Sequence, residues 1–314
     1  MSATLIDGRA LAAGIRDELR AYVTECTACG LRPPGLAVIL AGDDPASQIY
    51  VRNKTRMCEA IGIRPFTHQL PADVSAAQLM RRVRECSGDE RVDGVLVQLP
   101  LPPQLAQAGV EAQVIECIDP GKDVDGFHPY NVGRLVQRAP LLCACTPHGI
   151  MTMLRHIGCE LMGRSCTVVS ASNIVGRPMA LELLLAGATV TVTHRFTPPE
   201  VLQRHVQQAE VLIVAVGRPG FIDGRLIREG AVVIDVGINR LGDGRLCGDV
   251  QFEEACRRAA YITPVPGGVG PMTVATLMQN TVAAYCSHLG AAAPVPAPVA
   301  VPAPAMRAQA LTAG

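Results

Sequence analysis

CTVVSASNIVGRP, residues 166–178, is the stretch that decides the fold. It starts as an apolar run typical of a buried strand and passes through small residues into a helical pattern that Gly187 ends. A strand, a tight turn and a helix N-terminus offer free backbone N–H groups to a phosphate. Of the glycines usual in such a turn only Gly176 is present, with Ser170 and Ser172 at the two earlier places. Sequence context, more than the motif, therefore predicts a dinucleotide site here.

Apolar runs recur on both sides of this segment, at 36–41, 94–99, 189–194, 211–217 and 231–238. Strands that are apolar on nearly every residue and alternate with helical patterns indicate parallel sheets covered on both faces. Thr146 is placed to cap a helix and Pro147 to open it, so we divide the chain near residue 146. The expected fold class is α/β with two lobes.

The composition fits a two-domain globular chain and narrows its partners. The 314 residues are 49% hydrophobic and 3% aromatic, and 28 Lys+Arg balance 28 Asp+Glu. Zero net charge and few stacking side chains disfavour a nucleic-acid partner. The N-terminus has no signal-peptide pattern, so we expect a cytoplasmic protein. Five prolines within residues 291–314 exclude a membrane span there and predict a disordered Ala/Pro-rich tail.

The twelve cysteines are scattered along the chain, and reduced core thiols are the default without a secretion signal. Cys26 and Cys29 form the one C-x-x-C pair, without the second pair or the histidines at ligand spacing that a zinc site needs. We therefore expect no metal site.

The end of the second strand of this lobe bears on which dinucleotide binds. NAD enzymes place an acid there for the ribose 2′-hydroxyl, whereas this sequence has His194, Arg195 and Phe196. A cation suits a 2′-phosphate, which favours NADP over NAD; a solvated surface arginine is the alternative. Gly217 and Ile238 also follow apolar strands, where open α/β sheets line their ligand crevice.

In the first half, a lysine stands one helical turn after a tyrosine. Asp44 and Pro45 make a good helix start, and the spacing of Tyr50 and Lys54 puts both on one face. An ordinary amphipathic surface is the alternative. Gln98 stands inside an apolar strand pattern, where a buried amide has to be hydrogen-bonded, either to a functional group or to a loop.

Two further segments read as loops. KDVDG, residues 122–126, has two carboxylates that suit capping or ligand recognition, and it lacks the further acid of an EF-hand. TPVPGGVGPMT, residues 263–273, is too dense in Gly and Pro for a helix or an interior strand. It predicts a shaped loop before a last helix over about 272–289, either lining a ligand cleft or serving as a plain connector.

Taken together, these segments resemble the bifunctional methylenetetrahydrofolate dehydrogenase/methenyltetrahydrofolate cyclohydrolase family from about Ile6 to Ser287. The long matches are DPASQIYVRNK, DGVLVQLPLP, KDVDGFHPYNVGRL, SASNIVGRP and TPVPGGVGPMT, in the expected order. The resemblance implies an α/β folate-binding lobe over 1–145, with the last helix packing back on it. It also implies a Rossmann-type NADP lobe with a parallel sheet over 146–271, folate in the cleft between the lobes, and a homodimer.

The resemblance also implies roles for individual residues. The positions that match the family's catalytic residues are Tyr50, Lys54, Gln98 and Asp125. The expected substrate contacts are Tyr50, Gln98, Asp125, Pro266, Gly267 and Gly268. The expected cofactor contacts are Ser170, Ala171, Ser172, Arg195 and Ile238. The chain departs from the family pattern at Ser170, where many relatives have Gly, and at Ala144, where Pro is common.

The implied activity is oxidation of 5,10-methylenetetrahydrofolate with NADP⁺ followed by hydrolysis of the 5,10-methenyl product to 10-formyltetrahydrofolate. This activity belongs to one-carbon metabolism and purine biosynthesis. One alternative is a Rossmann oxidoreductase of the amino-acid dehydrogenase kind, which has no need for the tyrosine–lysine pair, VQLPLP and KDVDG together. The other is a non-catalytic nucleotide sensor, against which the intact catalytic positions count.

Overall fold

The first lobe is built on a three-stranded parallel sheet in the order β3-β2-β4. A computed structural model describes residues 2–106 and 109–290 of the chain, and the tail expected over 291–314 lies outside them. The strands are β2 (Gly35–Ala41), β3 (Arg64–Leu70) and β4 (Gly94–Val97). The surrounding helices are α2 (Pro45–Ile61), α3 (Ala76–Gly88), η1 (Pro103–Leu105) and α4 (Val110–Ile115). The next helix, α5 (Pro129–Val136), packs against α7 (Gly176–Leu185) of the second lobe. Every residue of β2 is buried, because it is the central strand.

The second lobe contains a six-stranded parallel sheet in the order β1-β11-β8-β7-β5-β6. The strands are β1 (Thr4–Leu5), β5 (Ser165–Val169), β6 (Thr189–Thr193), β7 (Val211–Val214), β8 (Val232–Asp235) and β11 (Tyr261–Ile262). The helices are α6 (Cys145–His156), α7 (Gly176–Leu185), α8 (Pro199–Gln208), η2 (Gly224–Leu226) and α9 (Phe252–Cys256). A short antiparallel pair is formed by β9 (Asn239–Arg240) and β10 (Leu246–Cys247).

Strand β5 is the point where the chain changes direction across this sheet. It pairs with β6 on one side and with β7 on the other. The chain therefore adds a strand on one side of β5 and then crosses over to add the next strand on the other side. A ligand crevice forms outside the carboxyl ends of the strands at such a switch point. The turn after residue 169 lies there, as the opening stretch of sequence predicts.

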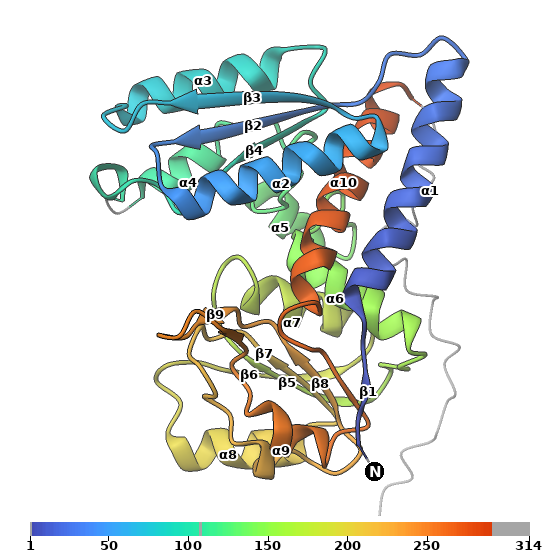
Figure 1. Cartoon of the computed structure of the whole chain (residues 1–314), viewed down its shortest axis with the longest axis vertical. Coiled ribbons are helices and arrows are strands. Elements are labelled where there is room, and N and C mark those ends of the chain that lie inside the picture. Colours follow the sequence, from blue (N-terminus) through green and yellow to red (C-terminus); the bar gives the residue numbers. More distant parts are fainter. Residues whose placement is uncertain (1, 107–108, 291–314) are drawn as a thin grey trace, which may run out of the picture.

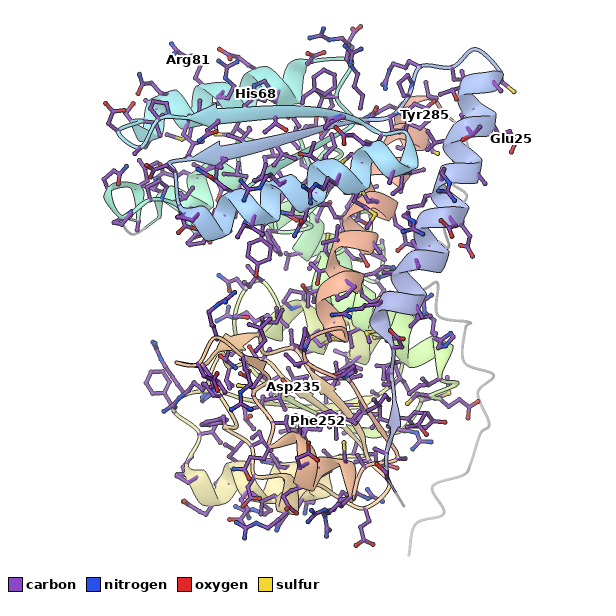
Figure 2. The ribbon with its side chains drawn as sticks, viewed as in Figure 1. Glu25, His68, Arg81, Asp235, Phe252 and Tyr285 are labelled. Atoms are coloured by element: carbon purple, nitrogen blue, oxygen red, sulfur yellow. The ribbon has the colours of Figure 1, made fainter. Side chains whose placement is uncertain are left out.

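Two long helices, α1 (Gly8–Ala28) and α10 (Val269–His288), run side by side between the lobes (Figure 1). The first turns of α10 place Met272 and Ala275 in the core of the second lobe. Its later turns place Met278, Val282 and Tyr285 in the core of the first lobe. Figure 2 shows Tyr285 near the end of α10 that lies in that lobe. One helix therefore belongs to both hydrophobic cores.

The α/β fold class and the parallel sheets are confirmed, and all six apolar runs contain strands. Two local predictions are wrong. The last helix begins at Val269, because Pro271 falls in the first turn, where backbone N–H groups need no partner. Thr146 caps no helix: α6 begins at Cys145, and Thr146 Oγ1 instead lies 2.9 Å from Thr273 Oγ1. None of the helices within residues 2–106 and 109–290 has both the length and the apolar content needed to cross a membrane.

Candidate active site

Helix α2 presents the tyrosine and the lysine. Asp44 accepts a hydrogen bond from the Ser47 backbone N–H at 2.7 Å, and Pro45 is the first helical residue, as predicted. Lys54 Nζ donates to Gln98 Oε1 at 3.1 Å, and Lys54 is only partly buried. No hydrogen bond joins Tyr50 to Lys54 in the described part of the chain; the Tyr50 ring is half exposed, one turn away.

The Gln98 amide is held so that its oxygen faces the lysine. Gln98 follows β4 directly, its backbone N–H donates to Ile39 O at 2.8 Å, and its Nε2 donates to Leu99 O at 2.7 Å. With the NH₂ group committed to the backbone, Oε1 accepts from Lys54. These contacts explain the amide in an otherwise apolar run: it orients the lysine.

Asp125 lies close enough to Lys54 for the two charges to interact. Burial raises the pKa of the Asp125 carboxyl above its usual value, Lys54 opposes that rise, and the Asp123 carboxyl adds to it. Asp123 itself is fully buried, and its Oδ2 accepts hydrogen bonds from His128 N and Asn131 Nδ2. The two acids of KDVDG therefore differ: Asp123 shapes the loop, and Asp125 remains available to a ligand.

The loop that carries Asp125 is fastened from behind by α10. Asn280 Nδ2 donates to Val124 O at 2.8 Å and to Cys143 O at 2.9 Å. Gly126 has a φ of 75°, and a Cβ there would lie 2.3 Å from the Cys143 carbonyl carbon. The loop thus packs directly on the backbone of the segment that leads into α6.

A pocket of about 210 Å³ opens between the lobes. It brings together five residues predicted for ligand contact: Tyr50, Ile238, Pro266, Gly267 and Gly268. Arg9 of α1 also lines it, and a Cβ on Gly267 would lie 3.1 Å from Arg9 Nε. Lys54 lies one turn along α2 from Tyr50. Together with Gln98 and Asp125 it forms a second group of predicted site residues.

The turn after β5 has the close packing that a dinucleotide turn requires. A Cβ on Gly176 would lie 2.4 Å from the backbone C and O of Ser170, so only glycine fits where α7 approaches the strand. Ser172 Oγ accepts from the N–H groups of Val175 and Gly176, both at 3.2 Å. Ser170 is buried, with its Oγ 3.3 Å from Ser172 Oγ. The residues at this turn fit a pyrophosphate.

Arg195 follows β6 and is exposed, with its guanidinium 4.8 Å from the centre of the Phe196 ring. Within the described residues no carboxylate forms an ion pair with it. An uncommitted guanidinium at this strand end fits a 2′-phosphate.

Two buried carboxylates that we did not predict from the sequence organise the loops after β7 and β8. Asp249 accepts from the N–H groups of Val216, Gly217 and Arg218 at 2.6–2.9 Å. Asp235 accepts from Gly237, Asp249 and Val250 at 2.9–3.0 Å. Burial raises the pKa of Asp235 to about 6, against those hydrogen bonds. Figure 2 shows Asp235 within the second lobe. An acid at the end of an apolar run was the signal for Asp235; nothing in their local sequence marks Arg9 or Asn280.

The second lobe has a parallel sheet whose strand order reverses at β5, and a turn there in which Gly176 packs against the strand. A pocket lies between this lobe and the first one. These features define a dinucleotide-binding protein of two lobes. Comparison with known families identifies which one. Residues 6–125 match the family described as tetrahydrofolate dehydrogenase/cyclohydrolase, catalytic domain, and residues 144–289 match its NAD(P)-binding domain. The chain belongs to the tetrahydrofolate dehydrogenase/cyclohydrolase family, as the sequence resemblance predicted, and this excludes the amino-acid dehydrogenase alternative.

Solved structures agree with this assignment. The bifunctional enzyme FolD from Campylobacter jejuni is 44% identical over 91% of this chain and 100% of its own, with a TM-score of 0.87. The Trypanosoma brucei enzyme, complexed with NADP and an inhibitor, is 39% identical over 93% of this chain and 100% of its own, also at 0.87. The bifunctional enzyme from Thermoplasma acidophilum is 31% identical over 91% and 100%, at 0.83.

Proposed function

We propose that the protein oxidises 5,10-methylenetetrahydrofolate to 5,10-methenyltetrahydrofolate with NADP⁺ and hydrolyses that product to 10-formyltetrahydrofolate. The observation that carries the proposal is the oriented Lys54–Gln98 pair, with Asp125 within electrostatic reach, beside a pocket between the two lobes. Relatives of known structure support it, because the Campylobacter and Thermoplasma enzymes are described as bifunctional.

A lysine at position 54, in a chain that otherwise uses arginine for nearly all of its positive charge, supports a role in proton transfer. Of the 28 Lys+Arg residues in the chain, only Lys54 and Lys122 are lysines. This chain therefore meets nearly every need for positive charge with arginine, which does not give up its proton. A lysine held by a neutral amide acceptor suits a group that must both take and release one.

The hydrolysis needs that chemistry and balances with it. Water adds its oxygen to the methenyl carbon and loses two protons: one goes to N5 as its bond to that carbon breaks, and Lys54 carries the other away. Asp125 binds the pterin, and Tyr50 with the loop at Pro266–Gly268 holds the folate ring against the cofactor side. When bound, NADP⁺ supplies the hydride acceptor for the oxidation.

For the cofactor, we assign the pyrophosphate to Ser170, Ala171 and Ser172, the 2′-phosphate to Arg195, and a backbone contact to Ile238. The division of the chain near residue 146 into a folate lobe and an NADP lobe is part of this proposal. The N-terminal strand is an exception to that division, since β1 pairs with β11 in the NADP-lobe sheet. The metabolic setting that we propose is cytoplasmic one-carbon metabolism, including purine biosynthesis.

We also propose a homodimer. In the described chain, the edge strand β3 pairs with β2 on one side only and spans seven residues. An unpaired edge of that length is a template for another strand, so a second copy along β3 would extend the sheet. Size-exclusion chromatography with light scattering should give twice the chain mass, and a monomer at micromolar concentration would contradict the dimer.

The activity is tested by following methenyltetrahydrofolate formation with NADP⁺ or NAD⁺ and then its hydrolysis. Lys54→Met should abolish hydrolysis while leaving some dehydrogenase turnover. The matched control is Lys122→Met, which removes the only other lysine, whose Nζ donates to the backbone oxygen of Asp89. Undiminished hydrolysis in Lys54→Met, or equal loss in both variants, would refute the role of Lys54. No methenyl product with either dinucleotide would refute the function.

A further inference from the structure

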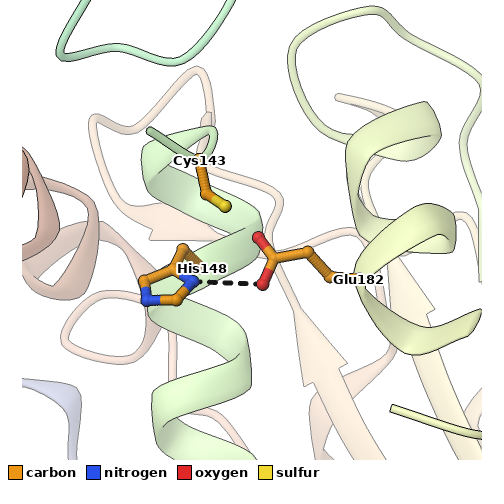
Figure 3. Close-up of side chains that lie close together, drawn as sticks. All are labelled: Cys143, His148 and Glu182. Carbon is orange, nitrogen blue, oxygen red and sulfur yellow. Dashed lines mark hydrogen bonds and ion pairs between the residues drawn. The ribbon is translucent and has the colours of Figure 1, made fainter. Parts of the chain in front are cut away.

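Three potential metal ligands that do not belong to the Lys54 group meet in the interior. Cys143 lies just before α6, His148 lies in the first turns of that helix, and Glu182 lies on α7 (Figure 3). They are 2%, 8% and 4% exposed, so all three are nine-tenths buried or more. One ligand atom from each lies within 4.8 Å of the others.

Only one of the two oxygens of the Glu182 carboxylate has a hydrogen-bond partner in the described part of the chain. His148 Nδ1 lies 3.1 Å from Glu182 Oε2, as the dashed line in Figure 3 marks. Glu182 Oε1 is buried and has no hydrogen-bond partner in the described part of the chain. A buried oxygen left in that state costs about 1–3 kcal/mol, more when it is charged. A cation among these side chains removes that cost.

The donor set selects the kind of cation. A thiolate, an imidazole and a carboxylate together match zinc, whereas calcium and magnesium take oxygen ligands. Bonds of about 2.0–2.3 Å in a tetrahedral site put ligand atoms roughly 3.3–3.8 Å apart. The present spread of up to 4.8 Å closes with side-chain movements of about 1 Å. We propose that Cys143, His148 and Glu182 supply three ligands of a zinc site, one atom from each side chain.

The position of the cluster makes this zinc structural. It would join the start of α6 to α7, the helix that follows the dinucleotide turn. The Cys143 backbone also supports the loop of Asp125, through Asn280 and through close packing with Gly126. The ligands are 5 and 34 residues apart (148 − 143 and 182 − 148), without the short paired spacing of sequence-level zinc motifs, so the sequence analysis predicted no metal site.

The alternative is a plain buried His148–Glu182 pair with Cys143 as a neighbouring thiol. The test uses the full chain, stripped with a chelator and dialysed against Zn²⁺ or Co²⁺ alone. Metal content should be about one per chain, and the Co²⁺ form should show the thiolate-to-cobalt charge-transfer absorption that only a cysteine ligand produces. Zn²⁺ should also raise the unfolding temperature by mass action.

Cys143→Ser should lose the charge-transfer absorption, and Glu182→Gln should weaken Zn²⁺ binding at least tenfold. The control is the double variant Cys26→Ser, Cys29→Ser, which removes the C-x-x-C pair and should bind as the wild type does. Circular dichroism of the metal-free proteins checks that each variant folds, and Cys143→Ala serves if the serine does not. A wild type that retains no metal, an absorption that survives loss of Cys143, or one that vanishes in the C-x-x-C control overturns the site.

Discussion

Replacing Asn280 by leucine isolates the support that α10 gives to the loop of Asp125. Asn280 is 8% exposed, and its Nδ2 donates to Val124 O and Cys143 O. Leucine has the same number and branching of side-chain heavy atoms, so the change removes hydrogen bonds without opening a cavity. Val124 O keeps the weak Cys145 Sγ donor at 3.1 Å, while Cys143 O loses the one partner that the described residues give it.

The expected loss of stability follows from those two bonds. Each contributes about 1 kcal/mol net, and an unpaired buried carbonyl adds about 1–3 kcal/mol, so Asn280→Leu should cost about 3–5 kcal/mol. For a chain of this size that is a fall in Tm of roughly 5–10 °C. Because the released loop carries Asp125, the KM for methylenetetrahydrofolate should rise, while the KM for NADP⁺ stays the same.

Urea unfolding and steady-state kinetics with each substrate varied in turn measure both effects. Thr281→Val is the matched control, because Thr281 is equally buried on α10 but its hydroxyl donates only within the helix, to Leu277 O at 2.8 Å. It should cost less than about 1.5 kcal/mol and leave both KM values unchanged. If Asn280→Leu behaves like this control, or raises both KM values equally, the reasoning about the loop is wrong.

Three further predictions concern other sites. Arg195→Ala should raise the KM for NADP⁺ about tenfold or more and leave that for NAD⁺ unchanged, since a charge-assisted hydrogen bond contributes about 1.5–3 kcal/mol; equal effects in steady-state assays would contradict a 2′-phosphate contact. Gly176→Ala should weaken NADP binding at least tenfold by calorimetry, because its Cβ would lie 2.4 Å from backbone atoms; unchanged affinity would refute the packing argument. Burial disfavours the Asp93 charge, but hydrogen bonds from Arg32 and His288 outweigh it and hold the Asp93 pKa below the ordinary 3.8. This stabilisation is fully present above pH 3.8 and is lost as the pH falls through the lowered pKa of Asp93. Asp93→Asn should therefore lower the free energy of unfolding in urea by about 3 kcal/mol at pH 7. The difference between variant and wild type should shrink below about pH 4.

The parts of the fold that the sequence predicts are those with a local cause. The central strands β2, β5, β7 and β8 are buried on both faces, so most of their residues are apolar. The edge strand β3 has alternating exposure and reads RPFTHQL, which has no continuous apolar run, and we did not predict it. Its strand state depends on the neighbouring β2, which is a tertiary contact.

The same distinction holds for the site. The spacing of Tyr50 and Lys54 and the isolated amide of Gln98 are visible in the sequence because helix and strand periodicity act over a few residues. Asn280 is not visible, because its partners at Val124 and Cys143 are 156 and 137 residues away. An asparagine in an apolar helix reads as a minor irregularity until the fold supplies the carbonyl groups that it serves.

Helix α10 fixes the distance between two loops of the site. Its N-terminus continues the loop of Pro266–Gly268 that lines the pocket, and Asn280, eleven residues further on, holds the loop of Asp125. At 1.5 Å per residue the two attachment points are about 16 Å apart on a rigid rod whose ends are packed in different cores. The spacing between the loop that lines the pocket and the loop of Asp125 is therefore set by a helix and not by a flexible linker. Changes that loosen α10 should misplace the folate relative to the cofactor without touching either, and so reduce the hydride-transfer rate more than the affinity for NADP⁺.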